Sequence, residues 1–512
     1  MKKAIANPYV VIVFLFLISV CIRIPQLIRP LSKHHEYCTA FNLRIMQVWY
    51  EEGAINHHFN PAMNYSGPEN KFINNNAPEK FDAKGNAYYL SYPPFTYIFP
   101  YVIFKSLHIT PNILGIRIIN LLLQLLGATF LFKIILLFAK ISPLSFGKGK
   151  RVRQSGFIAV IFFIFNPAGL FFQQNLWMTD VAVIPLFIIT AWWWLKLITE
   201  KKLSSFKHLA ALFLLVFFFN YTEYLGFTFS VVLGLFCFVR SFKDKKFLFP
   251  LCVLVVATLL AFVVTFLQYS SIWNIHEFWQ IAKDRYSYRS GYETGNENGT
   301  LQFFSNWKIV FQNYVLCFLP QLVFLFLATI ILVAKKQTSV FKLHGIKAAI
   351  MLFLFPCLLH HFIFLNASLY DFLVLKSIVF ISVSAAFLFF EIEIHLKRLS
   401  HCLFIAVFIS SIIIFHCINK PGEVSRIGDR YDMFETMGEK IKTIATNDEV
   451  IFIKNILDEP QLIYYAHRNM RVIENETQAF DFLKKYRRTK GIIFEADEHG
   501  TLSGKHIETA LP

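Results

Sequence analysis

Long apolar runs alternate with short basic segments along most of the chain. Runs of about 17 or more mostly hydrophobic residues recur between Val10 and Ile414, long enough for helices that cross a hydrocarbon layer roughly 30 Å thick. The pattern predicts a mainly α-helical, polytopic membrane protein. We expect about eleven transmembrane helices, at residues 8–29, 113–139, 155–172, 180–198, 208–222, 225–241, 247–268, 308–334, 347–366, 370–390 and 400–418.

The basic clusters between these runs predict the orientation of the chain. Short loops rich in Lys and Arg remain cytoplasmic, so successive clusters must be separated by an even number of crossings. The segment from Tyr92 to Leu107, which contains three prolines, is therefore expected to be an interfacial or partly re-entrant helix. Lys2 and Lys3 before the first run resemble a signal peptide, but no small-residue cleavage site follows, so this run is expected to remain as a span. The N-terminus is then predicted inside and the C-terminus outside.

Three large segments fall on the outer side in this arrangement. They are the loops 30–112 and 269–307 and the tail from residue 420. The tail alternates between helical and strand patterns, which is typical of a small α/β domain with a mainly parallel sheet. We therefore expect a transmembrane domain at residues 1–419 and an extracytoplasmic α/β domain at 420–512, and function should lie on the outer face.

Composition agrees with a membrane protein and excludes several other classes. Hydrophobic residues make up 55% of the chain and charged residues 16%, against about 25% charged in soluble proteins. A soluble enzyme, a disordered chain and a disulfide scaffold are excluded. The net charge of +17 lies in the loop clusters without a nucleic-acid-binding motif, so no nucleic acid partner is expected. Abundant Ile, Phe, Lys and Asn indicate a bacterial cytoplasmic (inner) membrane.

Two acidic residues at the predicted outer boundary are candidates for catalysis. Glu36 follows the first span beside His34 and His35, where a carboxylate can act as a general base toward a hydroxyl; the alternative is a solvated loop acid. Asp180 follows Thr179 at the start of the fourth span, and the alternative there is a helix cap. Glu223 is a third acid at this boundary, with the same two interpretations.

Basic and aromatic residues near the same boundary are candidates for binding a phosphate. Arg117 begins the second predicted span and is either an interfacial anchor or a phosphate ligand. His360 and His361 precede Asp371 and are either packing residues or ligands of a phosphate or metal. The remaining candidates lie in the outer loops: His35, Tyr92, Lys283, Arg285 and Arg289.

Taken in order, these landmarks resemble the GT-C class of membrane glycosyltransferases. The resemblance is to bacterial relatives of the protein O-mannosyltransferases (family 39) and to the lipid A aminoarabinose transferases. His35 stands where members often have Asp, and Tyr92 stands where aminoarabinose transferases have a basic residue. The resemblance rests on Glu36 after an Arg- and Pro-containing stretch, on Tyr92-Pro93-Pro94-Phe95, on Arg117 at the start of the second span, on Asn166-Pro167 followed by Asp180, and on Tyr464 to Arg468 in the tail.

The resemblance implies a sugar donor linked to polyprenyl phosphate and used at the outer face of the membrane. The acceptor would be a glycan, a lipid or a protein. Glu36 would remove the proton of the attacking hydroxyl, with inversion at the sugar, and Asp180 would orient the acceptor or support a divalent metal ion. No metal ligand is assigned, although Asp180 and His361 have suitable donor atoms. The alternatives are a transporter or flippase, or an O-antigen polymerase or ligase, for lipid-linked saccharides.

Overall fold

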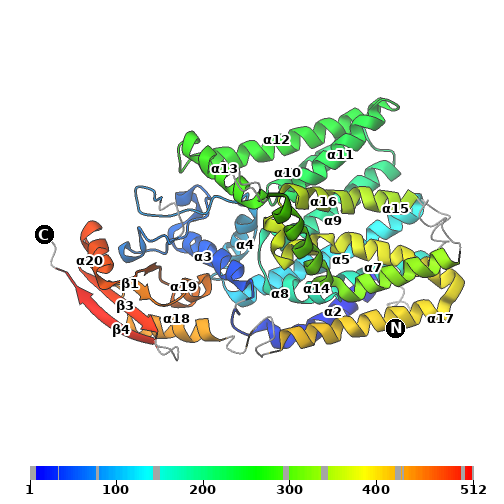
Figure 1. Ribbon diagram of the computed structural model, residues 1–512. Helices are drawn as coiled ribbons and strands as arrows, with labels where there is room; N and C mark the ends of the chain where they lie inside the picture. Colours follow the sequence, from blue (N-terminus) through cyan, green and yellow to red (C-terminus); the bar gives the residue numbers. More distant parts are fainter. Residues whose placement is uncertain are drawn as a thin grey trace.

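The computed structural model describes residues 7–32, 34–75, 80–141, 150–291, 299–335, 344–420, 428, 432–496 and 502–509. Long helices form a bundle that fills one end of the molecule, and a small sheet lies at the other end (Figure 1). The bundle helices are α2 (Pro8–Leu27), α5 (Ile113–Ile141), α7 (Lys150–Ile164), α8 (Pro167–Asn175), α9 (Thr179–Thr199), α10 (Phe206–Asn220), α11 (Leu225–Ser241), α12 (Leu248–Ser270), α14 (Gly299–Ala334), α15 (His344–Ala349), α16 (Phe355–Ile363) and α17 (Ile378–Asn419).

The bundle helices confirm the predicted polytopic architecture. Within the described residues, seven helical segments are long and apolar enough to cross a membrane, and the pair α7 and α8, bent by 63°, makes an eighth if it forms one broken span. α10 and α11 are shorter apolar helices. α17 departs from helical geometry at Leu396 (φ −142°, ψ 61°), and its two arms correspond to the last two predicted spans. Each of the eleven predicted spans is thus occupied by helix in the described residues.

Short helices connect the bundle segments. A turn of 3₁₀ helix, η3 (Lys245–Phe247), precedes α12, and a π-helical turn, η5 (Ile350–Leu354), joins α15 to α16. Two 3₁₀ segments, η6 (Ala367–Leu369) and η7 (Asp371–Ser377), lead from α16 into α17. η7 is buried along its whole length, so the charged side chains that it carries enter the interior.

The two predicted outer loops are largely folded. Residues 30–112 contain α3 (Glu36–Glu52), the 3₁₀ turns η1 (Ala54–His57) and η2 (Pro68–Asn70), and α4 (Phe95–Ser106). α4 has 12 residues, which at 1.5 Å per residue gives about 18 Å, too short to span the hydrocarbon layer. This agrees with the expectation of a helix that does not cross. The second loop is mainly α13 (Ile275–Ser290), which follows α12 along the edge of the molecule (Figure 1).

A four-stranded sheet lies near the C-terminus. Its order is β2-β1-β3-β4, with β1 parallel to both β2 and β3 and with β4 antiparallel to β3. The parallel part was predicted from the sequence, whereas β4 was not. The elements are α18 (Met433–Ile444), β1 (Val450–Lys454), α19 (Pro460–Ala466), β2 (Met470–Val472), α20 (Glu476–Lys485), β3 (Lys490–Ala496) and β4 (Leu502–Glu508).

The sheet packs on both faces, as the alternation of its apolar residues requires. Ile451 and Ile453 of β1 pack in one cluster with α18 and α19, and the intervening Phe452 packs with α20 on the opposite face. Successive side chains of a strand point to opposite faces, so one short strand supplies two hydrophobic cores.

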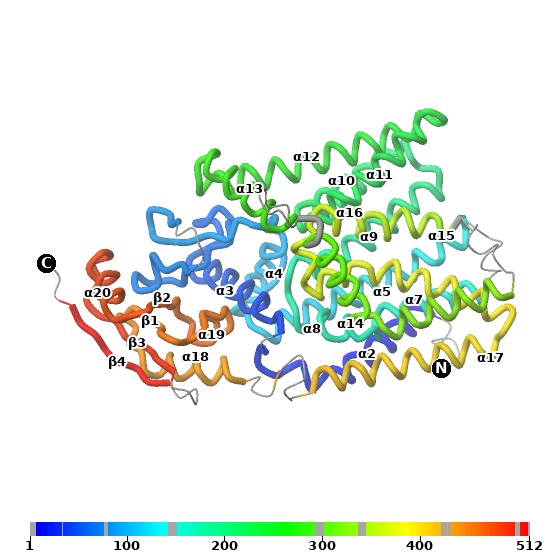
Figure 2. The backbone as a smooth tube through the Cα atoms, viewed as in Figure 1, coloured from blue at the N-terminus to red at the C-terminus, as the bar shows by residue number. Residues whose placement is uncertain are grey.

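The C-terminal unit also contacts the segment that follows the first helix. The backbone N–H of Leu31 donates a hydrogen bond of 2.8 Å to the Tyr465 hydroxyl, and the Gln461 side chain donates one of 3.0 Å to the carbonyl of Ser32. Figure 2 shows these parts, blue and orange, side by side. The tail therefore helps to position the segment that carries the candidate residues 34–36.

Candidate active site

Glu36 lies at the first turn of α3 and is completely buried. Its Oε2 atom accepts hydrogen bonds of 2.6 Å from the Arg29 guanidinium and from the backbone N–H of Ser32. Its Oε1 atom accepts one of 3.2 Å from Arg117. Arg117 also donates to the carbonyls of Leu27 and Arg29. The carboxylate therefore joins the end of α2, the start of α3 and α5.

These contacts favour a structural role for Glu36 over that of a base. Burial alone raises the pKa of the Glu36 carboxyl, but the positive charges of Arg29 and Arg117 outweigh it and hold this pKa below its usual value. A carboxylate with a lowered pKa and both oxygens occupied accepts a proton poorly. Arg117 is also fully buried, and its guanidinium binds Glu36 and backbone carbonyls. Of its two interpretations, these contacts favour an anchor over a phosphate ligand.

Asp180 belongs to a second, separate cluster of buried charged side chains. Its Oδ1 atom lies 2.6 Å from the Lys376 ammonium, which also lies 3.2 Å from Glu223. Glu223 in turn contacts His360 Nε2 at 2.9 Å. All four side chains are at most 3% exposed. Two carboxylates thus share one buried ammonium, from α9, η7 and the turn between α10 and α11.

The two acid clusters lie on neighbouring segments, and within the part of the chain that the structure describes they share no partner. The Thr39 hydroxyl of α3 donates to the carbonyl of Asn175 and accepts from the N–H of Trp177, just before α9 begins. The structure thus places the start of α3, with Glu36, against the loop that leads to Asp180. Each carboxylate is neutralised by its own basic residues.

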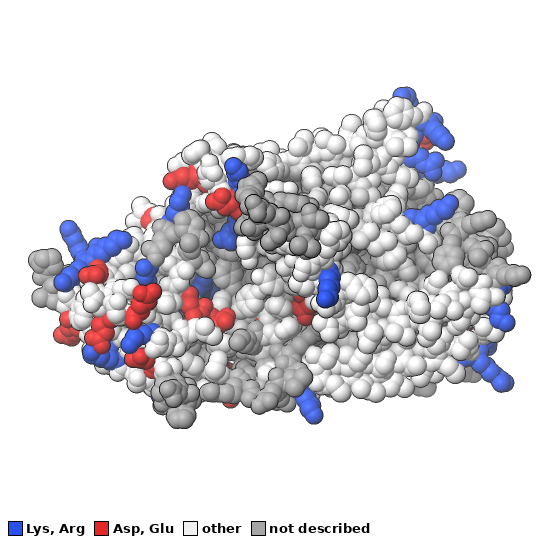
Figure 3. All heavy atoms as spheres, viewed as in Figure 1, with Lys and Arg blue, Asp and Glu red and all other residues white. Residues whose placement is uncertain are grey.

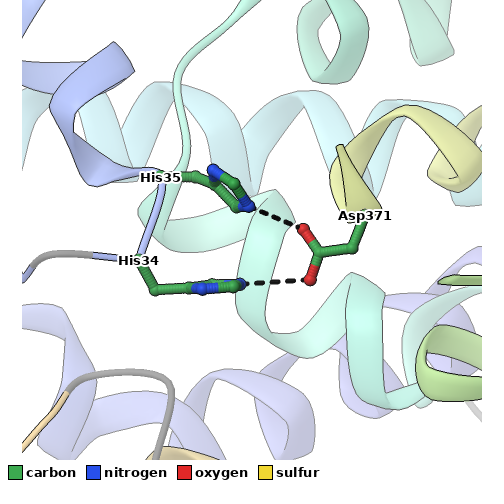
Figure 4. Close-up of side chains that lie close together, drawn as sticks. All are labelled: His34, His35 and Asp371. Carbon is green, nitrogen blue, oxygen red and sulfur yellow. Dashed lines mark hydrogen bonds and ion pairs between the residues drawn. The ribbon is translucent and has the colours of Figure 1, made fainter. Parts of the chain in front are cut away.

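His34 and His35 form a third cluster with Asp371. His34 Nε2 lies 3.1 Å from Asp371 Oδ2, and His35 Nε2 lies 3.0 Å from Oδ1 (Figure 4). Asp371 is the first residue of η7, and Lys376 lies on the same segment. η7 therefore links this cluster to the one around Asp180. The sequence placed His35 among the substrate-binding candidates, but the pairing with Asp371 was not predicted.

An apolar cavity of about 680 Å³ lies beside α12 and α13. Phe262 and Trp279 line it and are 61% and 57% exposed, so the cavity is open to the surroundings of the bundle. Most of its wall is aromatic or aliphatic. Its lining residues are Leu90, Ser91, Pro93, Asn220, Tyr224, Phe227, Thr258, Ala261, Phe262, Thr265, Phe266, Tyr269, Phe278, Trp279, Ala282, Lys283, Arg285, Tyr286, Arg289 and Phe364.

Arg289 gives this cavity a buried cationic wall. Its guanidinium carbon lies 3.7 Å from the centre of the Tyr92 ring and 5.7 Å from that of Tyr224. The Ser91 hydroxyl accepts a hydrogen bond of 2.7 Å from it. Aromatic faces attract a guanidinium and fix its plane. Arg289 and Tyr92, two predicted candidates from different loops, are thus brought together.

The other predicted residues are divided between the cavity and the core. Arg285 lines the cavity, with its guanidinium carbon 5.6 Å from the Tyr89 ring centre. His361 is buried away from it: its Nε2 contacts the Tyr314 hydroxyl at 3.0 Å and its Nδ1 contacts Ser368 at 2.8 Å. Both ring nitrogens of His361 therefore have hydroxyl partners, which corresponds to the packing interpretation.

Lys376 is the functional candidate that the sequence analysis missed. It is the one lysine within the predicted span 370–390. A charged residue inside a membrane segment is costly, so it usually has a specific partner. That signal was available in the sequence, although it does not identify Asp180 and Glu223 as the partners.

A wall of aromatic contacts connects the cavity to the buried charges. Phe364 lines the cavity, and the centre of its ring lies 5.1 Å from that of Tyr224 and 5.2 Å from that of His360. Since His360 contacts both Glu223 and Lys376, one layer of side chains separates the cavity from the buried charge cluster. A long apolar ligand with an anionic group fits this arrangement.

Comparisons with known proteins agree with this architecture. No protein-family model and no curated protein matches the sequence. Among solved structures, ArnT from Cupriavidus metallidurans bound to undecaprenyl phosphate is 11% identical, with a TM-score of 0.56 over 97% of this chain and 94% of that chain. The apo form of the same ArnT gives 0.57 over 95% and 93%, also at 11% identity. The oligosaccharyltransferase of Archaeoglobus fulgidus in complex with Zn and sulfate is 11% identical, with a TM-score of 0.56 over 96% and 72%. The chain therefore has the fold of these two proteins, which confirms the predicted GT-C architecture.

Proposed function

We propose that the chain is a membrane glycosyltransferase that moves a sugar from a polyprenyl-phosphate-linked donor to an acceptor. The main observation behind this proposal is the apolar cavity of about 680 Å³, which has the buried guanidinium of Arg289 in its wall. The shared fold supports the proposal, because the ArnT structure is bound to undecaprenyl phosphate and an archaeal oligosaccharyltransferase structure contains dolichol-phosphate.

The shape and polarity of the cavity suit a lipid-linked phosphate. The exposed rings of Phe262 and Trp279 leave a route by which an isoprenoid chain can enter from the bilayer. Arg289 is 8% exposed, and a desolvated guanidinium binds a phosphate more strongly than an exposed one does. Lys283 and Arg285 add positive charge to the same wall. The phosphate is the leaving group, so these cations stabilise the charge that develops on it.

The reaction is a displacement at the anomeric carbon of the sugar. The oxygen of the acceptor hydroxyl forms a bond to this carbon, and the bond between the carbon and the phosphate oxygen breaks with its electron pair. The hydroxyl proton passes to a carboxylate. Of the two predicted acids, Asp180 suits this step better than Glu36, because among the described residues its Oδ2 atom accepts only a long hydrogen bond of 3.4 Å, from Thr179.

The charge distribution supports the proposed orientation in a bacterial cytoplasmic membrane. In Figure 3, Lys and Arg predominate at the end of the bundle opposite the sheet, whereas at the sheet end they are mixed with Asp and Glu. Since basic loops remain cytoplasmic, the sheet and the cavity then belong to the outer side. On this proposal residues 1–419 form the membrane domain and residues 420–512 the extracytoplasmic domain, and the acceptor is a glycan, lipid or protein at the outer face of the cytoplasmic membrane.

A divalent cation is part of the proposal, as one archaeal structure with this fold contains Zn. Neither of the ligands suggested by the sequence suits it. Asp180 is paired with Lys376, and both ring nitrogens of His361 contact hydroxyl groups. Among the described residues, His34, His35 and Asp371 remain suitable as ligands of a cation.

The test is binding of undecaprenyl phosphate to the purified chain in detergent. Arg289→Gln removes the buried charge and should weaken binding roughly 10- to 100-fold, because a hydrogen bond to a charged group contributes about 1.5–3 kcal/mol. Arg240→Gln is the matched control: Arg240 also stacks on a ring, that of Phe236 at 5.6 Å, but lies outside the cavity. Equal binding by Arg289→Gln and the wild type, or equal affinity for undecaprenol, would refute the proposal.

Activity is tested by mass spectrometry of glycans and lipid A from cells with and without the chain. A sugar added in the presence of the wild type and absent with Arg289→Gln is the expected result. Labelled donor that crosses vesicle membranes unchanged would instead identify a transporter.

A further inference from the structure

Three side chains from two distant segments of the sequence converge where α3 begins. His34 and His35 each direct Nε2 toward one oxygen of the Asp371 carboxylate, at 3.1 and 3.0 Å (Figure 4). The three donor atoms all lie within 4.8 Å of one another. We propose that His34, His35 and Asp371 together bind one divalent cation of the zinc type.

The donor set and its spacing suit such a cation. Two imidazole nitrogens and one carboxylate oxygen are common ligands of Zn²⁺, which binds them at about 2.0–2.2 Å. In a tetrahedral site, ligand atoms at these bond lengths lie roughly 3.3 Å apart. The two histidine-to-carboxylate separations are already close to this value, so small side-chain movements suffice. A bound cation would take the place of the direct contacts that the two imidazoles now make with Asp371.

The histidine rings are held in place and remain accessible. His35 has a φ of 57°, in the left-handed region that costs a non-glycine residue energy and that recurs at functional sites. Its ring lies edge-on to the rings of Tyr370 and Phe372, at 5.7 and 5.0 Å. The side chains of His34 and His35 are 27% and 18% exposed. A cation can therefore enter, and three protein ligands leave a position open for an outside ligand.

The site lies one short segment away from the Asp180 cluster. Asp371 begins η7 and Lys376 lies five residues later, which is about 10 Å along a 3₁₀ segment. Cation binding follows from the three ligands alone, whereas a role in sugar transfer rests on the proposed function. In that role the bound cation supplies Lewis-acid stabilisation of phosphate oxygens, while His34, His35 and Asp371 hold it at the start of α3.

The experiment measures metal content and affinity of the purified full-length chain. The protein is stripped with EDTA, loaded with Zn²⁺ or Co²⁺ and dialysed. We expect one equivalent per chain by mass spectrometry of the metal, and a Co²⁺ absorption spectrum typical of nitrogen and oxygen ligands. His35→Ala and Asp371→Asn should each bind Zn²⁺ at least about tenfold more weakly. The melting temperature should rise on addition of Zn²⁺ in the wild type and not in these variants.

The matched control is His467→Gln. His467 also pairs with a carboxylate, that of Glu51 at 2.7 Å, but has no second histidine beside it among the described residues. It should retain wild-type metal content. The proposal is overturned if the wild type holds no more metal than Asp371→Asn, or if His467→Gln loses as much as His35→Ala.

A measurement on the wild type alone tests the metal site even if the variants do not fold. Pulsed EPR of the Cu²⁺-loaded chain should show coupling to imidazole nitrogens, and its absence would also overturn the site. Metal bound through these residues by a chain that transfers no sugar would confirm the site and count against the proposed function.

Discussion

Replacement of Glu36 by glutamine leaves two guanidinium groups buried without a counter-ion. The side chains of Arg29 and Arg117 are 6% and 0% exposed, and Glu36 is fully buried. Removal of one partner from a buried ion pair costs about 3–5 kcal/mol, because the remaining charge stays desolvated. Glutamine has nearly the same shape, so the loss reports the charge rather than a cavity. We expect Glu36→Gln to destabilise the chain by about this amount.

The loss is measured by thermal unfolding of the purified protein in detergent, with size-exclusion chromatography to determine the folded fraction. Glu51→Gln is the control on the same helix. Glu51 pairs with His467 at 2.7 Å, but these side chains are 25% and 42% exposed, and such surface pairs contribute at most about 1 kcal/mol. The melting temperature should therefore fall clearly for Glu36→Gln and little for Glu51→Gln.

A double variant distinguishes a structural role of Glu36 from a catalytic one. In Glu36→Gln with Arg29→Gln the two losses should be less than additive, by about 0.5–3 kcal/mol, because the residues are in direct contact. If Glu36→Gln melts at the wild-type temperature and yet abolishes sugar transfer, Glu36 acts in the reaction and the structural assignment is refuted.

Two further predictions concern other charged groups. Lys376→Met leaves the carboxylates of Asp180 and Glu223 buried without their shared ammonium, so unfolding scans should show a loss of about 3–5 kcal/mol; unchanged stability would contradict the ion pairs. In Glu52, burial raises the pKa, but hydrogen bonds from groups including His57 lower it overall to about 2. The stability that Glu52 contributes is therefore present above its ordinary pKa of about 4.5 and is lost as the pH falls toward 2. Glu52→Gln should flatten this part of the stability curve measured against pH.

The helical segments could be predicted because their signal is local. A membrane span needs some 20 apolar residues in succession, and the prolines of the segment after Tyr92 marked α4 as different. β4 was missed because its residues give no such signal. Only Leu502 and Ile507 of β4 are buried in hydrophobic clusters, and the positions between them are exposed. Its place is determined by antiparallel pairing with β3, which is a tertiary contact.

The candidate site residues could be proposed from the sequence but not their contacts, because residue type indicates chemistry and does not identify partners. Arg289 and Tyr92 were identified individually from the loops that carry them, but their stacking at a separation of 197 positions in the sequence cannot be deduced from spacing. Glu36 was singled out as a base since an acid beside histidines suits that role. The partners of these residues come from segments that only the fold brings together. Arg29 and Arg117 bind the carboxylate oxygens of Glu36, and Asp371 contacts His35.

The hydrogen bonds between the tail and the segment after α2 determine when this region can take its final form. Leu31 and Ser32 obtain partners that are made 434 and 429 residues later. At typical synthesis rates of about 5–20 residues per second, this delay is roughly 20 to 90 seconds. During that time the stretch carrying His34, His35 and Glu36 lacks these partners and waits for the end of the chain. A ribosome stalled before residue 461 would leave a helical bundle whose contacts between this stretch and the C-terminal domain have not yet formed.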